Sequence, residues 1–542
     1  MRAREEAGEA ADERHHFILS IPVADRPAHL RACLESIHRL CECFGYGGRS
    51  NGRYSRIQVL IAEDSREPES VRQHRALAEE YRRKGLQVFH FGLDEQYELL
   101  QSIPVNERRE LAHILGTPPK ERFYLKGQAV NRNLSYLKCL QLSADRARTL
   151  YYMVDSDESF CVSRQTGAGE QAVHALNYFY YIDRVFRTSD TRILTGKMVG
   201  DPPVSPAVMA ANFLDDITAF FTMLADTRAG QACRFHAPAP DATAGSRQDA
   251  AYHDMAGLFG FESPRQVFPY HCELAGEHDN AACLRELAGR LAAFFFGEHL
   301  TRKTWFGWQG AFDDRTPART LYPGNYVANY EGLRYVIPFG HLRLRMSGPT
   351  AGRLIAAEIG ERFASVNLPH LHRRTAGGDL HGAFRPGVEL DREAQREIID
   401  LSNEFERQFF GDLMLFTTET LVREADVHRP FEKDCITAIM ERKERELLQL
   451  YQHKRDAIGE KTRALETLVF QDGHWWLDRP ELADALSRVR SFLDNVRRNF
   501  GEHSPAWEQI RSAEHRDERK RQITEALMHY RSGREAWERL IY

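Results

Sequence analysis

The chain has 542 residues, more than one compact core usually holds, so we expect two or three packed units. Its hydrophobic content of 42% and charged content of 28% are those of a folded globular protein and exclude a largely disordered one. The formal net charge of -5 argues against a broadly basic protein that binds nucleic acid.

Cysteine usage and apolar runs indicate a cellular location. The nine cysteines are scattered and none forms a Cys-x-x-Cys pair with zinc spacing, which is typical of reduced thiols in the cytoplasm. Apolar runs such as Leu291 to Phe296 are far shorter than the roughly 20 residues that span a bilayer. Residues 1–15 are charged and predict a disordered tail, not a signal peptide. We expect a cytoplasmic protein with no transmembrane segment, and attachment to a membrane surface stays open.

Strand-like and helix-like segments alternate over residues 16–160. Four short apolar runs have the pattern of buried parallel strands: 17–23, 57–62, 86–91 and 150–154. Between them we expect helices from about residue 27, over 69–84 and from Gly127, with a helical insertion over 94–122. This alternation predicts an α/β fold with a mostly parallel sheet and helices on both faces. Ligands of such sheets bind beyond the carboxyl ends of the strands.

The rest of the chain is less regular. The pattern is mixed over 160–320, returns to short strand-like pieces over 321–346, and becomes charged and helical from 391 onward. We therefore predict one α/β unit over 16–385 and a helical region over 391–542. The helical region is expected to pack on the first unit or on a second copy in a homodimer.

Asp155-Ser156-Asp157 directly follows the fourth predicted strand. Two carboxylates two residues apart, in the turn after a buried strand, can hold a divalent cation such as Mg²⁺ or Mn²⁺. Such a cation neutralises the charge of a diphosphate leaving group. An acidic surface turn is the plainer interpretation, but the position at a strand end favours a site.

Three further motifs occur at strand or helix ends in the same order as in a known family. They are Ile21-Pro22-Val23-Ala24-Asp25-Arg26-Pro27, Glu63-Asp64-Ser65 and Lys126-Gly127-Gln128-Ala129-Val130-Asn131-Arg132-Asn133. Together with the Asp-x-Asp turn they resemble family 2-like glycosyltransferases of the GT-A fold, closely over about 16–160 and loosely over 190–380. The resemblance implies a nucleotide-binding half, 16–160, and an acceptor half, 190–385.

The resemblance also implies a reaction and its ligands. The protein would be a hexosyltransferase that moves a sugar from a nucleoside diphosphate sugar to a small-molecule, glycan or lipid-linked hydroxyl. The implied contacts to the nucleotide sugar are Pro22, Val23, Asp25, Arg26, Glu63, Asp64, Gly127, Asn131, Arg132, Asp155 and Ser156. Asp155 and Asp157 would act in catalysis by holding Mn²⁺ or Mg²⁺. Each motif also has a plain interpretation as turn, helix-cap or surface residues.

The acceptor side resembles the family less closely. The residues implied there are Gly324, Asn325, Arg345 and Gly348. Inverting members usually carry a Glu-Asp pair as the catalytic base, but the corresponding stretch here, Leu344 to Thr350, has no carboxylate. An inverting reaction would need another base, for which Asp254 is a candidate. A retaining reaction needs no dedicated base, and we favour it slightly.

A second metal element is expected at Leu368 to Arg374. Several GT-A families place a His after the acceptor region as a metal ligand, and His suits Mn²⁺-type sites. His372 is the first candidate and His370 the second. A basic surface segment is the plainer alternative.

Two other functions stay open. A nucleotidyltransferase acting on sugar phosphates also uses an α/β sheet and Mg²⁺, but it usually carries a Gly-rich first loop, which Pro22 to Pro27 lacks. A catalytically inactive protein that binds nucleotide sugars would explain the missing Glu-Asp pair.

Overall fold

The computed structural model describes residues 13–166, 169–235, 267–304, 310–335, 338–375, 389–391 and 398–542. The candidate base Asp254 and residues 1–12 of the expected tail lie outside these ranges.

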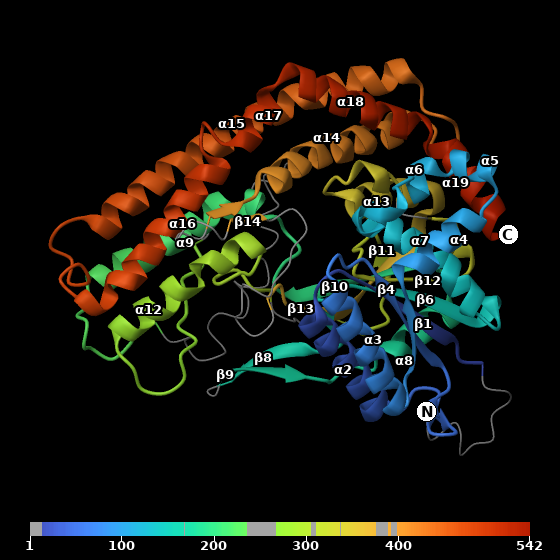
Figure 1. Cartoon of the computed structure of the whole chain (residues 1–542), viewed down its shortest axis with the longest axis horizontal. Coiled ribbons are helices and arrows are strands. Elements are labelled where there is room, and N and C mark those ends of the chain that lie inside the picture. The colour runs from blue at the N-terminus through green and yellow to red at the C-terminus, as the bar shows by residue number, and fades with distance from the viewer. Residues whose placement is uncertain are drawn as a thin grey trace.

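A nine-stranded sheet is the centre of the first unit (Figure 1). Its order is β11-β13-β10-β12-β6-β1-β4-β5, and β7 pairs with β13 beside this path. The strands are β1 (His16–Val23), β4 (Ile57–Glu63), β5 (Gln87–Phe91), β6 (Thr149–Val154), β7 (Glu158–Ser159), β10 (Ile193–Gly200), β11 (Thr316–Pro317), β12 (Asn325–Ala328) and β13 (Phe363–His372). Strands β5, β4, β1, β6, β10 and β13 run in one direction, whereas β12, β11 and β7 run against it. The prediction of a mostly parallel sheet is confirmed.

All four predicted strands are present, as β1, β4, β5 and β6, within one or two residues of the expected bounds. The expected helices are α2 (Pro27–Phe44), α3 (Pro68–Arg83) and α7 (Gln128–Leu142). The insertion contains α4 (Leu93–Ser102), α5 (Val105–Glu110), α6 (Ala112–Leu115) and the 3-10 turn η1 (Lys120–Leu125). Each of α2 and α3 begins with proline at its first position, where the missing N–H has no partner to lose.

Helices cover both faces of this sheet. One face packs against α2, α3 and α8 (Tyr178–Thr188), through side chains such as Leu34, Leu77 and Phe179. The other face packs against α4, α7, α13 (Ser347–Ile359) and α19 (Tyr530–Ile541). The apolar runs of β1, β4 and β6 follow from burial on both sides.

The helical unit is built from two distant parts of the chain. Among the described residues its helices are α9 (Pro206–Ala225), α12 (Asn280–Arg290), α14 (Ser402–Glu424), α15 (Lys433–Phe470), α16 (Ala483–Phe500), α17 (Pro505–Arg511) and α18 (Ala513–Met528). Residues of α9 and α12 share one apolar core with those of α14 to α18 (Figure 1). Sequence patterns did not indicate this shared core, because the apolar face of a helix does not show which other helices it packs against.

The described ranges also contain shorter elements. Three two-stranded sheets among them pair β2 (Arg49–Ser50) with β3 (Arg53–Tyr54), β8 (Val162–Thr166) with β9 (Gly169–Val173) and β14 (Glu389–Asp391) with β15 (Ile398–Asp400). The remaining 3-10 turns are η2 (Arg146–Arg148), η3 (Leu291–Phe296), η4 (Glu331–Arg334), η5 (Gly340–Leu342), η6 (Gly360–Arg362) and η8 (Pro480–Leu482).

Helix α19 returns to the sheet unit, where it lies against α5 (Figure 1). Trp537 of α19 is fully buried, and its Nε1–H donates a hydrogen bond to the carbonyl of Leu333 at 2.8 Å. Its ring lies 6.4 Å from that of Tyr136 on α7, centroid to centroid. The C-terminal region therefore packs on the first unit through α19. This agrees with the first of the two expectations for the region, and the second, a homodimer, stays a prediction.

Among the described residues, one helix is long and apolar enough to cross a membrane by length and composition. It is α9, and 61% of its apolar window is buried inside the protein. Asp216 in its middle is fully buried and forms two hydrogen bonds with Arg302, from Nε at 2.8 Å and from Nη2 at 3.0 Å. A buried core helix can have the same length and apolar composition as a membrane span, and α9 packs as a core helix.

The buried ion pair gives a stability prediction with a matched control on the same helix. Asp216→Asn removes a fully buried carboxylate that balances the charge of Arg302, so we expect a loss of about 3–5 kcal/mol in the free energy of unfolding. Asp215→Asn removes only the half-exposed contact with Lys461, 2.6 Å long, and we expect about 0–1 kcal/mol. Urea denaturation of both variants measures the difference, and equal losses would contradict the assigned role of Asp216.

Candidate functional site

The predicted acidic turn lies at the carboxyl edge of the sheet. Strand β6 ends at Val154, directly before Asp155. The parallel strand β1 ends at Val23, three residues before Arg26, and β13 ends at His372, two residues before Arg374. Because these strands run in one direction, their ends bring residues from three distant parts of the chain together.

Asp157 is the centre of this group. Its carboxylate is buried, with 4% of the side chain exposed. Arg26 donates from Nη1 to Oδ2 at 2.8 Å, and Arg374 donates from Nη1 to the same oxygen at 3.3 Å. Burial alone would raise the pKa of Asp157, but His372 and the two arginines hold that pKa well below its usual range. Asp157 is therefore an anion.

The ring of His372 is aimed at Asp157. Its Nδ1 is hydrogen-bonded to the backbone carbonyl of Asp201, so this nitrogen carries the N–H. The other nitrogen, Nε2, lies 3.5 Å from Oδ2 of Asp157. Asp201 also accepts the backbone N–H of Arg374 at 2.8 Å and that of His299 at 2.9 Å. Sequence reasoning missed Asp201, whose signal is its place directly after β10.

Asp155 is the more accessible carboxylate of the turn, with 23% of its side chain exposed. It pairs with the buried guanidinium of Arg132 on α7, a residue predicted to touch the nucleotide. Gly324 lies against it: a Cβ added at Gly324 would be 3.0 Å from Cγ of Asp155 and 1.9 Å from Oε1 of Glu158. Gly324 is thus needed for the close packing of the acidic turn. Ser156, which lies between the two aspartates in the chain, is buried.

Glu158 was not predicted, although it continues the acidic run. It is fully buried, and its Oε2 lies 2.7 Å from Nδ1 of His370. The Nε2 of His370 lies 2.8 Å from the hydroxyl of Tyr152, which donates to Oδ1 of Asn325 at 3.0 Å. Both ring nitrogens of His370 are therefore engaged, whereas His372 has one directed at Asp157.

The direction of each hydrogen bond determines which of these four side chains, Glu158, His370, Tyr152 and Asn325, carry protons. Asn325 uses its amide N–H groups on the carbonyls of Lys197 and Leu368, so its Oδ1 must accept the Tyr152 proton. The Tyr152 oxygen then accepts from Nε2 of His370, which leaves Nδ1 as an acceptor for Glu158.

The charges agree with this assignment. Burial raises the pKa of Glu158 well above its usual range, and the charges of Asp155 and Asp157 raise it further. Burial also lowers the pKa of His370 to about 3. Glu158 is therefore a neutral acid that donates to a neutral imidazole. Its Oε1 is buried without a hydrogen-bond partner.

Two of the residues expected to contact the nucleotide are engaged within the protein. Asp25, with a left-handed φ of 52°, accepts the backbone N–H groups of Arg66 and Glu67, both at 3.0 Å. Glu63 is fully buried and bonds Nδ1 of His74 at 2.9 Å and Nε2 of His90 at 3.1 Å. Both residues shape the loop after β4.

Asp64 and the start of α7 form a second polar group. The Asp64 carboxylate pairs with the buried Lys126 amine, and burial nevertheless raises the pKa of Asp64 to about 6. Asn131 is buried and donates to the carbonyl of Ala62 at 3.3 Å. Gly127, with φ of 87°, begins α7 in a conformation that other residues avoid. At the end of β1, Pro22 and Val23 pair with Ala62 and Glu63 of β4.

The predicted acceptor residues separate into two places. Gly324 and Asn325 lie at the acidic turn, as described above. Gly348 is in the first turn of α13, where an added Cβ would be 2.4 Å from the carbonyl of Leu321. Arg345 is directed toward α14, with Nε 3.4 Å from Oε1 of Glu404.

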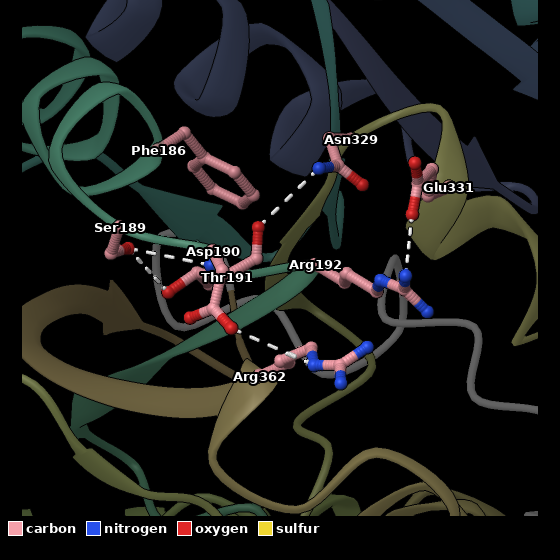
Figure 2. Close-up of a pocket in the computed structure, with 8 residues that line it drawn as sticks. All are labelled: Phe186, Ser189, Asp190, Thr191, Arg192, Asn329, Glu331 and Arg362. Carbon is pink, nitrogen blue, oxygen red and sulfur yellow. Dashed lines mark hydrogen bonds and ion pairs between the residues drawn. The ribbon is translucent and has the colours of Figure 1, made fainter.

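A surface pocket lies at the opposite end of the strands. Figure 2 shows its lining, which comes from the starts of β10 and β13 and the segment after β12. Its charged side chains are paired with each other, Arg192 with Glu331 at 2.7 Å and Arg362 with Asp190 at 3.6 Å (Figure 2). None of the predicted site residues lines it.

Comparison with known proteins gives only distant likenesses. No family model and no curated protein matches the chain. The crystal structure of residues 1–349 of TarS from S. aureus matches with a TM-score of 0.30 and 11% identity over 96% of this chain and 92% of that one. A mannosyltransferase from Pyrobaculum calidifontis, in complex with GDP-Man and Mn²⁺, matches with a TM-score of 0.31 and 8% identity over 91% of both chains. A longer TarS structure matches with 0.29 and 12% over 89% of this chain and 55% of that one. At these scores the likenesses carry no argument about function.

The neutral state of Glu158 predicts a pH dependence. Its pKa is higher in the folded protein than the unfolded value near 4.3, so the folded state keeps a proton that the unfolded state releases above about pH 4.3. This contribution lowers stability as pH rises, by up to roughly 1.4 kcal/mol per pH unit. Glu158→Gln keeps a donor toward His370 and removes the titration. We therefore expect its stability relative to wild type to rise as the pH increases above the unfolded value of about 4.3.

Urea unfolding at several pH values measures this difference. Glu361→Gln, at an exposed position, is the control and should follow the wild-type curve. A difference between Glu158→Gln and wild type that stays constant with pH would show that Glu158 is ionised.

Proposed function

We propose that the chain is a metal-dependent glycosyltransferase of the GT-A type that uses a nucleoside diphosphate sugar. One observation carries the proposal: Oδ2 of Asp157 and Nε2 of His372 face each other at 3.5 Å, and the proton that Nε2 carries when His372 balances the Asp157 charge is the one that a metal ion would displace. Two acceptors held face to face fit a cation that binds both.

The residues present fit Mn²⁺ or Mg²⁺. A carboxylate oxygen and an imidazole nitrogen are ligands for Mn²⁺-type ions, and the Asp201 carbonyl holds the ring in the required orientation as an outer partner does in metal sites. Asp157 and His372 would hold the ion, and Asp155 would have to turn from Arg132 to join them, because the donor atoms of these three residues do not all lie within 4.8 Å of one another. When bound, such an ion neutralises the charge that develops on the diphosphate leaving group.

Arg26 and Arg374 support the same assignment. Both guanidinium groups lie on Asp157, where they balance its buried charge. A planar guanidinium also matches a phosphate oxygen pair. With a cation on Asp157, these two arginines are placed to bind the diphosphate of the donor. The Asp64–Lys126 pair and Arg132 would border the nucleotide on the side of α7.

The acceptor would enter on the side of Gly324, which packs closely against Asp155. Residues Ser347 to Thr350 begin α13 and supply no carboxylate, and Glu158 is a neutral acid without the charge of a base. We therefore include a retaining reaction in the proposal, since it needs no dedicated protein base. Transfer of a hexose to a hydroxyl group is the expected chemistry.

One observation favours a second candidate. The two arginines on Asp157 compete with a metal ion for the same oxygen. A protein that binds nucleotide sugars without turning them over could keep this closed arrangement. Release of nucleoside diphosphate separates the two functions.

The test is a thermal-shift screen of nucleotide sugars with and without Mn²⁺. A ligand at about 100 times its Kd stabilises the folded state by about 2.7 kcal/mol, so one donor should raise the Tm only when Mn²⁺ is present. Asp157→Asn and His372→Gln should lose this shift, because each removes a ligand. Asp190→Asn is the matched control, since Asp190 is also a paired carboxylate but lies in the pocket of Figure 2.

Turnover is measured in the same samples as metal-dependent release of nucleoside diphosphate, and NMR of the product sugar gives the stereochemistry. A shift that Asp157→Asn leaves unchanged would refute the metal site. A shift without release would favour the binding protein. Formation of pyrophosphate from a nucleoside triphosphate and a sugar phosphate would identify a nucleotidyltransferase.

A further inference from the structure

Three cysteines that belong to no common sequence motif lie close together inside the helical unit. The Sγ atoms of Cys233, Cys272 and Cys283 all lie within 4.8 Å of one another, and all three residues are buried. Cys233 follows α9, Cys272 precedes α12, and Cys283 lies in the first turns of α12. All three are free thiols. The spacing of these cysteines along the chain matches no Cys-x-x-Cys pair, so the sequence alone did not predict the group.

A histidine lies beside the group, against Cys272. Nε2 of His278 lies 3.2 Å from Sγ of Cys272. Its Nδ1 lies 2.9 Å from the carbonyl of Gly276, which fixes the ring N–H on Nδ1 and leaves the Nε2 lone pair directed at Sγ of Cys272. This orientation, with a backbone carbonyl behind the ring, is the one that metal-binding histidines adopt.

Backbone hydrogen bonds hold the four residues in place. The N–H of Cys233 donates to the carbonyl of His278 at 2.9 Å, and that of Cys272 donates to Phe235 at 2.7 Å. The N–H of Cys283 donates to the carbonyl of Asp279, whose side chain caps α12 by accepting from Ala282 at 2.8 Å. The donor atoms are therefore gathered by the fold itself.

We propose that Cys233, Cys272, His278 and Cys283 form a structural Zn²⁺ site. Three cysteines and one histidine are a common ligand set for structural zinc. Two sulfurs that share one tetrahedral zinc are roughly 3.8 Å apart, given Zn–S bonds of about 2.3 Å, so small side-chain rotations suffice. Soft thiolates select zinc over the hard cations that carboxylates prefer, which separates this site chemically from Asp157.

The site would tie the ends of two segments together. Zinc would close the chain between Cys233 and Cys272 and fix both ends to α12, which restricts the unfolded chain. From α12, Arg290 bonds Oε1 of Glu298 at 2.6 Å, and Glu298 bonds Thr375, the neighbour of Arg374. The metal would thus support the segment that carries an arginine of the candidate active site.

Metal analysis of the purified full-length protein tests the proposal. We expect about one zinc ion per chain in the wild type and less than about a tenth of that in Cys283→Ser. Cys43→Ser, at an exposed cysteine, and Asp157→Asn are the controls, and both should keep their zinc.

Cobalt gives a readout that does not depend on how the variants fold. After zinc is removed from the wild type and Co²⁺ is added, thiolate ligation produces an intense sulfur-to-cobalt charge-transfer absorption, and Asp157→Asn should show the same band. No zinc in the wild type together with no such band would overturn the proposal. Zinc content that follows Asp157 and not Cys283 would do so too, as would a native mass two hydrogens below that of the reduced chain, since two of the thiols would then form a disulfide.

Discussion

The burial of one negative charge, that of Asp157, organises the candidate site. A carboxylate removed from water is costly unless cations or hydrogen-bond donors surround it. Here the compensation comes from Arg26 after β1 and from His372 and Arg374 at the end of β13. The charge is balanced only when these segments meet, so the site and the sheet depend on each other. A metal ion and a diphosphate would replace this compensation with a similar arrangement of charges.

Next to the ionised Asp157 lies a group of neutral polar side chains. Glu158, His370, Tyr152 and Asn325 form a continuous hydrogen-bonded chain in which no member carries a charge. A second buried anion beside Asp157 would raise the cost of both, which explains why Glu158 keeps its proton. This neutral chain joins β6, β12 and β13 and fixes the direction of His370. His372 alone of the two histidines is left to face Asp157.

The sequence was sufficient for what depends on local patterns. The strands 17–23, 57–62 and 150–154, and the acidic turn after the last of them, followed from apolar runs and from the geometry of parallel sheets. The structure confirms the fold and places Asp25 and Glu63 in roles within the protein. Three features needed long-range packing that no local pattern encodes: the different surroundings of His370 and His372, the support from Asp201, and the shared core of α9 and α14. The cysteine group was hidden for the same reason.

Helix α19 carries a consequence for how the molecule is made. The sheet is encoded before residue 373, yet the apolar core on one of its faces also includes Trp537 and Ile541 of α19. Domains generally begin to fold from the N-terminus while the ribosome is still adding residues. During that time the surface beside Tyr136 and Leu333 has no cover, and the half-built chain presents an apolar surface to chaperones. Synthesis of α19 ends this period, so damage to Trp537 should appear first as poor yield from the cell and only second as a change in the finished protein.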